Sequence, residues 1–167
     1  MANQHVLSIL VQNRPGVLTR ISGLFSRRGY NIDSLSVCAT EDDNYSRMTI
    51  SLGGNDRIVS QILSQLEKQV DVVKVEDFAN AKSVFRELLI IKIQCNAKQR
   101  SEIVDICTIF YAKTIDISAD DTMIIELTGE SQKIDALIDI MRPYGVLEMA
   151  RTGGAALERG RNTLRTK

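Results

Sequence analysis

The spacing of apolar residues along the first half of the chain predicts six secondary-structure elements. Residues 4–12 are almost continuously apolar and predict a buried strand. Residues 17–25 carry apolar side chains at helical spacing, and residues 30–40 predict a second strand, with a β-bulge where the alternation breaks at Asp33 and Ser34. The other elements are a strand with Met48, Ile50 and Leu52 on one face, a helix with Ile58, Ile62, Leu63 and Leu66 on its stripe, and a strand over 70–75.

The ends of the first helix carry residues that favour those positions. Asn13 is predicted to be the N-cap, and Pro15 suits the first turn, where no backbone N–H is needed. Arg27 and Arg28 place cations near the negative end of the helix dipole, and Gly29 can adopt the positive φ of a helix stop. These signals predict a helix that begins just after Asn13 and ends near Arg28.

The second half repeats this order after about 80 residues. Acidic residues at 120–121 form a predicted turn, and Ser131 is predicted to cap a last helix that stops at Pro143. The predicted elements are a strand over 84–94, a helix with Ile103, Ile106, Cys107 and Phe110, strands over 112–118 and at MIIEL, a helix with Ile134, Leu137, Ile138 and Met141, and a strand over 146–149.

The order βαββαβ, found twice, defines the fold class as α+β with two ferredoxin-like domains. Each is expected to be an antiparallel four-stranded sheet with both helices on one face and the other face uncovered. The predicted division is an N-terminal domain over 1–77, a linker over 78–83, a C-terminal domain over 84–155 and a basic tail over 156–167. Because such small domains bury little surface and leave sheet edges unpaired, we expect a homodimer or a larger assembly.

Composition excludes several classes of function. Hydrophobic residues make up 44% of the 167 and charged residues 25%, as in ordinary globular proteins. Lys and Arg together number 21, as do Asp and Glu, so no net charge attracts nucleic acid or an anionic membrane. No apolar run is long enough to span a bilayer, and the N-terminus shows no signal sequence. We therefore expect a cytoplasmic protein with no nucleic-acid or membrane partner.

No catalytic residues are visible in the sequence. The single histidine, His5, opens a strand and is predicted to lie at the surface, and the acidic runs 41–43 and 120–121 lie between strands, where acidic residues form turns. No GxGxxG or GK[ST] motif occurs. The three cysteines, too widely spaced for a disulfide framework or a paired metal site, are Cys38, Cys95 and Cys107. The sequence therefore predicts a non-catalytic chain with no metal site.

The opening segment carries the most specific motif: ILVQNRPGVLTRISGLFSRRGYNIDSLSV, with an N-x-P-G-V-L turn, a glycine stop and a strand beginning Y-N-I. It resembles an ACT domain, the ferredoxin-like module that binds amino acids as feedback effectors. With SRMTI, QLEKQVDVVKVEDF, RELLIIKI and ARTGG in the expected order, residues 4 to about 160 resemble the regulatory small subunit of acetolactate (acetohydroxyacid) synthase. The resemblance implies a large catalytic subunit as partner, with thiamine diphosphate, Mg²⁺ and FAD on that subunit and no cofactor on this chain.

The turn before the first helix is the predicted effector site. The first N–H groups of a helix lack partners and lie at the positive end of its dipole, so they can bind a carboxylate, and Gly16 lets a ligand approach closely. A plain N-cap at Asn13 and a simple helix start at Gly16 would explain the same residues. The resemblance favours valine, or leucine or isoleucine, bound at a dimer interface between this turn and the partner's second strand. The predicted site residues are Asn13, Pro15, Gly16, Val17, Leu18, Asn31 and Ile32, the two asparagines for polar contacts and Val17, Leu18 and Ile32 for an apolar wall.

The C-terminal residues are basic. Five cations (Arg151, Arg159, Arg161, Arg165 and Lys167) face one anion (Glu158), a net charge of +4. We favour a solvent-exposed terminus over a contact with the large subunit, and either over nucleic-acid binding, because no aromatic residues are interleaved with the cations.

The resemblance and the missing active site predict a regulatory subunit that activates the large subunit and confers feedback inhibition. The main alternative is a free-standing ACT sensor that controls a different metabolic enzyme. An acylphosphatase of the same fold would need a phosphate-binding loop with an Arg/Asn pair, and Pro15 removes a donor from the 13–18 loop. An RNA-binding module would need stacking aromatic residues on its central strands, which instead carry aliphatic and small polar residues.

Overall fold

The computed structural model of the chain describes residues 3–78 and 82–165. They form two compact units. The N-terminal unit runs up to Val84 and also includes the residues from Gly153 onward, and the C-terminal unit is Phe85–Thr152. The predicted linker over 78–83 lies partly outside the described residues, since 79–81 are not among them.

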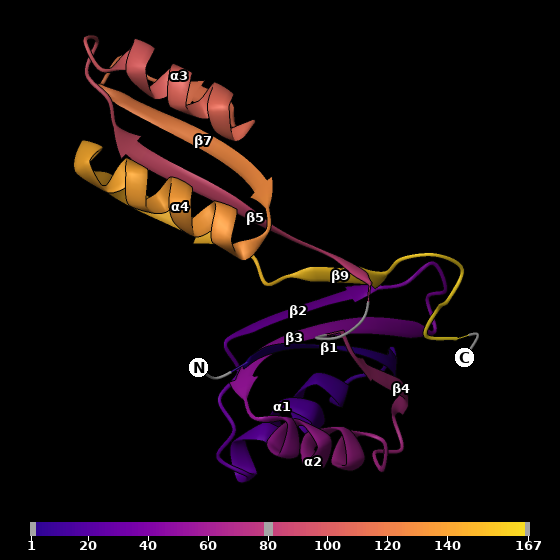
Figure 1. The fold of residues 1–167 in the computed structure, drawn as a ribbon. Helices are drawn as coiled ribbons and strands as arrows, with labels where there is room; N and C mark the ends of the chain where they lie inside the picture. Colours follow the sequence, from indigo (N-terminus) through magenta and orange to yellow (C-terminus); the bar gives the residue numbers. More distant parts are fainter. Residues whose placement is uncertain (1–2, 79–81, 166–167) are drawn as a thin grey trace. The chain divides into compact units, whose positions relative to one another are not determined.

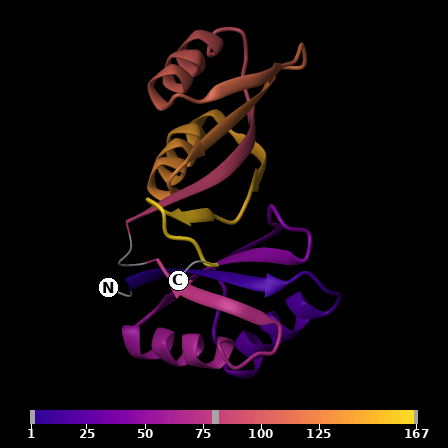
Figure 2. The ribbon, with the colours of Figure 1, turned by 90° about the vertical axis from the view of Figure 1, so that its right-hand side faces the viewer.

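The N-terminal unit has the predicted βαββαβ order. Its antiparallel sheet has the strand order β2-β3-β1-β4, and both helices cover one face (Figures 1 and 2). Leu7 and Ile9 of β1 and the predicted residues Met48, Ile50 and Leu52 of β3 are fully buried against the helices, which confirms the period-two prediction. The elements are β1 (Asn3–Gln12), α1 (Val17–Arg27), β2 (Ser34–Ala39), β3 (Tyr45–Gly54), α2 (Asp56–Leu66) and β4 (Val72–Asp77).

The C-terminal unit has the same topology, with the strand order β6-β7-β5-β8 and α3 and α4 on one face of the sheet. Alternate residues of β5 and β7 form its core with the helices, and the α+β class with two ferredoxin-like domains is confirmed. The elements are β5 (Ser83–Gln94), α3 (Arg100–Phe110), β6 (Lys113–Ile117), β7 (Thr122–Gly129), α4 (Ser131–Met141), a 3₁₀ turn η1 (Arg142–Tyr144) and β8 (Val146–Arg151).

Two local predictions in the sequence were wrong. No bulge occurs at Asp33 and Ser34, because β2 begins at Ser34 and pairs with β3 without a register shift. Ser131 is the first residue of α4 rather than its N-cap, a position that Glu130 occupies without a capping side-chain bond. The Ser131 hydroxyl instead donates to Oε1 of Glu87 at 2.6 Å, because this buried carboxylate on β5 lies beside the start of the helix.

Glu87 is the centre of a charged cluster in the C-terminal unit. Its side chain is 7% exposed, and its Oε2 accepts a hydrogen bond from Nε of Arg151 on β8. Nη1 of Arg151 also donates to Asp135 of α4, at 2.6 Å. Partial burial alone would lower the pKa of Arg151, but these hydrogen bonds outweigh it and hold the pKa above its ordinary value. The cluster thus joins β5, β8 and α4.

The residues after β8 form a C-terminal segment, defined as residues 153–165, that belongs to the N-terminal unit. It contains a further strand, β9 (Ala155–Glu158), and the Arg159 N–H donates to the Lys82 carbonyl oxygen at 2.7 Å within the N-terminal unit. Gly153 lies so close to β2 that a Cβ there would be 2.7 Å from the Leu35 carbonyl. Ala156 and Leu164 of the predicted solvent-exposed tail are buried, whereas most of its other described residues are exposed as predicted. The N-terminal compact unit includes the residues from Gly153 onward, so its boundary differs from the predicted one between residues 155 and 156.

The sheet face opposite α1 and α2 is buried too, unlike the uncovered face that we expected. Leu10 is 2% exposed, Thr49 3% and Ser51 2%. Leu164 of the C-terminal segment is also buried and lines the same pocket as Leu10. Since periodicity within 1–77 cannot show a segment that returns from residue 153, this covering was not predictable from the strand pattern.

Candidate amino-acid-binding site

The predicted effector turn, defined as residues 13–16, connects β1 to α1 and contains a left-handed glycine. Gly16 has φ +84° and ψ −8°, and the helix starts at the next residue, Val17. The Arg14 N–H donates to the Gln12 carbonyl oxygen at 3.0 Å, and the Val17 N–H donates to the Arg14 carbonyl oxygen at 3.3 Å. Glycine adopts this φ without the steric cost that a Cβ brings, so it allows the abrupt change from strand to helix.

Asn13 is not the N-cap of α1, contrary to our prediction. Gly16 occupies that position, and no side chain caps the helix. Asn13 lies three residues too early to reach the N–H groups of the first turn, and Pro15 correspondingly precedes the helix. The Asn13 side-chain Nδ2 donates to the Asp43 carbonyl oxygen at 2.9 Å, and the Asn13 backbone N–H donates to the Asn44 carbonyl oxygen at 2.8 Å. Asn13 thus joins the effector turn to the turn between β2 and β3.

The start of α1 presents unpaired donors. The Arg20 N–H is the first to bond within the helix, to the Gly16 carbonyl oxygen at 3.0 Å. Among the described residues, no acceptor faces the N–H groups of Leu18 and Thr19, and the first turn contains no acidic side chain. Together with the partial positive charge of the helix dipole, these donors can bind a carboxylate.

The apolar residues of the predicted site differ in exposure. Val17 is 4% exposed and packs in the core, so its side chain offers little surface to a ligand within one chain. Leu18 is 45% exposed beside the free N–H groups and is available to a ligand's side chain. Ile32 packs partly against the core, and Asn31 is exposed and donates from Nδ2 to Oδ1 of Asp33 at 2.8 Å.

Within one chain, the predicted residues fall into two separate groups. Gln12 lies opposite Tyr45 in the β1–β3 pairing, whereas Ser34 lies opposite Ser51 in the β2–β3 pairing. Six residues of β3 separate these positions, which is about 20 Å along a strand. Asn31 and Ile32 therefore lie at the other end of α1 from the effector turn. Both groups can contact one ligand only if a second chain supplies one of them.

The turn between β2 and β3 lies next to the effector turn. Residues from both turns line a surface pocket of about 290 Å³: Gln12, Asn13, Arg14, Asp43, Asn44 and Tyr45. The acidic run 41–43 was predicted only to form a turn, which it does. Its second role as a neighbour of the effector turn depends on the β1–β3 pairing, and no sequence motif signals it.

The histidine and the cysteines lie in different parts of the fold. His5 is 3% exposed rather than at the surface as predicted, because Nδ1 is 2.7 Å from Oδ2 of Asp77 on β4. Cys38 is exposed while Cys95 and Cys107 are buried, and burial raises the pKa of the Cys107 thiol. Among the described residues, no group of three or more His, Cys, Asp or Glu side chains could hold a metal ion. None of the described helices is long and apolar enough to cross a membrane.

The fold and the turn define a class of protein: two ferredoxin-like domains, the first with the strand–turn–helix of an ACT domain. Two family models match the chain, "AHAS small subunit-like ACT domain" over residues 7–74 and "Small subunit of acetolactate synthase" over residues 86–160. The chain belongs to the family of acetolactate synthase small subunits.

Individual relatives agree with this assignment. The acetolactate synthase small subunit of Mycolicibacterium smegmatis is 44% identical over 156 residues, which cover 93% of this chain and 91% of the relative. That of Aquifex aeolicus is 41% identical over 157 residues, which cover 93% and 81%. The crystal structure of the small subunit from Thermotoga maritima superposes with a TM-score of 0.85 at 38% identity, covering 95% of this chain and 99% of that one. The match therefore extends over both units.

Proposed function

We propose that this chain is the regulatory, non-catalytic subunit of an acetolactate synthase. It binds a large catalytic subunit, raises its activity and confers feedback inhibition by valine, leucine or isoleucine. Catalysis, the condensation of two pyruvates to 2-acetolactate and CO2, takes place on the large subunit with thiamine diphosphate, Mg²⁺ and FAD. The similarity to small subunits over both units supports this assignment.

The observation that carries the effector site is the start of α1. Its free N–H groups and left-handed Gly16 create room and positive potential for the carboxylate of an amino acid. Leu18, exposed beside them, offers an apolar contact to a branched side chain. Asn31 and Ile32 of a second chain complete the site, since in one chain they lie at the far end of α1. The effector therefore binds at a dimer interface.

We expect no acetolactate from pyruvate with this chain alone, and a higher rate when it is added to the large subunit. The rate of acetolactate formation, measured with and without valine, checks both effects. A large subunit whose rate and valine response do not change on mixing would contradict the regulatory role. In that case, capture of a different metabolic enzyme by the immobilised chain would favour a free-standing ACT sensor.

We expect the isolated chain to sediment as a dimer, twice 18.6 kDa, at micromolar concentration. β2 is an edge strand of the N-terminal sheet, and its Val37 is 43% exposed, so it offers backbone groups and apolar surface to a second chain. Val37→Lys should weaken the dimer, while Val70→Lys, at a residue 93% exposed outside any strand, should not. A wild-type chain that stays monomeric with and without valine would contradict the dimeric site.

A further inference from the structure

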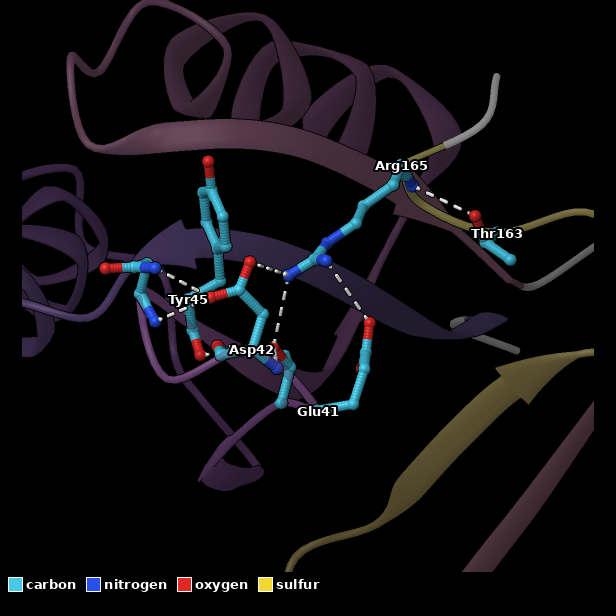
Figure 3. Close-up of polar contacts among 7 residues, drawn as sticks. Glu41, Asp42, Tyr45, Thr163 and Arg165 are labelled. Atoms are coloured by element: carbon cyan, nitrogen blue, oxygen red, sulfur yellow. Dashed lines mark hydrogen bonds and ion pairs between the residues drawn. The ribbon is translucent and has the colours of Figure 1, made fainter.

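The last described residue, Arg165, contacts the turn between β2 and β3 (Figure 3). Its guanidinium lies over the Tyr45 ring, 4.7 Å from the ring centroid. Nη1 is 3.4 Å from Oε1 of Glu41, and Nη2 is 3.3 Å from Oδ2 of Asp42. One side chain thus makes two ion pairs and a cation–π contact, which together stabilise its position more than a single exposed ion pair would.

The C-terminal segment holds Arg165 in this place. Leu164, the preceding residue, is 4% exposed and lines a pocket with Leu10, Val73 and Tyr45. At the other end of the segment, Gly153 packs directly on the backbone of β2. Buried contacts along the segment reduce the conformational entropy that Arg165 loses when it binds the turn.

The turn that Arg165 contacts is itself cross-linked. Oδ1 of Asp42 accepts from the N–H of Asn44 at 3.0 Å and from its Nδ2 at 2.8 Å, and the Tyr45 N–H donates to the Asp42 carbonyl oxygen at 2.9 Å. These hydrogen bonds from Asn44, with the nearby Arg165 guanidinium, hold the pKa of Asp42 below its ordinary value. Asp42 therefore stays charged near neutral pH and pairs with Arg165.

The same turn holds the effector turn through Asn13. The carbonyl oxygens of Asp43 and Asn44 accept both hydrogen bonds from Asn13, at 2.9 and 2.8 Å. A continuous chain of contacts therefore runs from Arg165 through Asp42 and its neighbours to Asn13, three residues before Gly16. All of these residues belong to the N-terminal unit.

We propose that Arg165 is a positioning residue for the effector turn: by binding Glu41, Asp42 and Tyr45 it fixes the turn that holds Asn13 in the conformation that binds the amino acid. This inference rests on the proposed function. A turn fixed in advance loses less entropy on binding, so the effector binds more tightly when the segment is docked. By thermodynamic linkage, the bound effector must stabilise the docked segment by the same factor.

Calorimetric titration of the isolated full-length chain with valine, leucine and isoleucine tests this inference. Arg165→Ala should weaken binding of the effector roughly 5–10-fold, within the usual range of coupling between sites. Arg165→Lys keeps the charge but loses the planar two-point contact, so its affinity for the effector should lie between that of Arg165→Ala and that of the wild type. Arg161→Ala is the matched control, because it removes the same charge from the same segment and Arg161 has no ion pair among the described residues.

The effect of valine on limited trypsin digestion after Arg159 and Arg161 provides a second readout. If Arg165 had a merely structural role, its replacement would not change this effect of valine. Cleavage should be faster when the C-terminal segment detaches, because a protease binds an extended stretch of chain, so the change in rate on adding valine reports how firmly the segment is docked. Valine should slow this cleavage in the wild type by about the factor that Arg165→Ala loses in affinity, and should have little effect in Arg165→Ala.

The outcomes separate the two proposals. If the wild type binds an amino acid and Arg165→Ala binds it equally well, the positioning role is wrong while the proposed function stands. Cleavage that valine does not slow in the wild type would overturn the positioning role in the same way. If the wild type binds none of the three amino acids at millimolar concentration, the proposed effector site fails and the positioning role fails with it.

Discussion

Replacing Gly16 by Asp is expected to abolish the response to the effector, with valine binding weakened about 100-fold or more. The new carboxylate would occupy the space at the start of α1 where the ligand's own carboxylate is expected. Two like charges in close contact in a partly desolvated site cost several kcal/mol. The helix itself tolerates the change, because an acidic residue near its N-terminus is favourable by about 0.3–1 kcal/mol. Activation of the large subunit should be retained.

The positive φ of Gly16 determines which control is needed. At φ +84° any side chain adds backbone strain, about 1–2 kcal/mol for an ordinary residue, although a Cβ would meet only Nη1 of Arg20 at 3.4 Å. Gly16→Asn has nearly the same shape as Gly16→Asp, tolerates this conformation and carries no charge. Calorimetric titration and inhibition curves should show a much smaller loss for Asn than for Asp. Equal losses would mean that shape or strain, and not the carboxylate, prevents binding. A Gly16→Asp protein that folds and responds to valine at the wild-type concentration would contradict a site at this turn.

Elements that depend on neighbouring residues could be predicted from the sequence. Met48, Ile50 and Leu52 alternate with polar residues, and pleating alone places them on one face, where the structure buries them. The end of α1 was predicted for the same reason: Arg28 is its C-cap and Gly29 follows with φ +69°. Repetition of these local patterns in the second half was enough to predict the second domain.

Features that depend on distant residues could not be predicted. His5 is buried because Asp77, 72 residues later, provides a hydrogen-bond partner. Arg165 contacts Glu41 and Asp42, which nothing in a run of basic residues indicates. The prediction of where α1 starts was wrong for a different reason. Asn13 and Gly16 are both acceptable N-caps, and the left-handed conformation of Gly16 decides between them.

The position of the candidate site along the chain could be predicted from its motif, but the spatial arrangement of its residues could not. The turn before α1 was identified from its residues, and the structure gives it free N–H groups and an exposed Leu18. Val17 lies on the apolar stripe predicted for residues 17–25 and is buried in the core. The separation of Asn31 and Ile32 from this turn follows from the register of β2 on β3, which requires the sheet topology.

Arg151→Met is expected to destabilise the C-terminal unit by about 2 kcal/mol. Removing one partner of a buried ion pair typically costs about 3–5 kcal/mol, and the 30% exposure of Arg151 reduces the expected loss. Glu87, 7% exposed, would keep a buried carboxylate with Ser131 as its one remaining side-chain donor among the described residues, whereas Asp135, 58% exposed, would remain solvated. For a domain of this size, thermal unfolding followed by circular dichroism should show a midpoint about 10 °C lower.

A second arginine of the same unit provides the matched comparison. Arg142 pairs with Asp139 at 3.0 Å, but both side chains are about 70% exposed, so Arg142→Met should change the free energy of unfolding by less than about 0.5 kcal/mol. The double variant Arg151→Met with Glu87→Gln should recover much of the loss, because no buried charge remains and the amide oxygen that replaces the carboxylate can still accept from Ser131. If Arg151→Met were as mild as Arg142→Met, the Arg151–Glu87 ion pair would not contribute to the stability of the C-terminal unit. If the double variant were no more stable than Arg151→Met, the unpaired carboxylate would not be the cause of the loss.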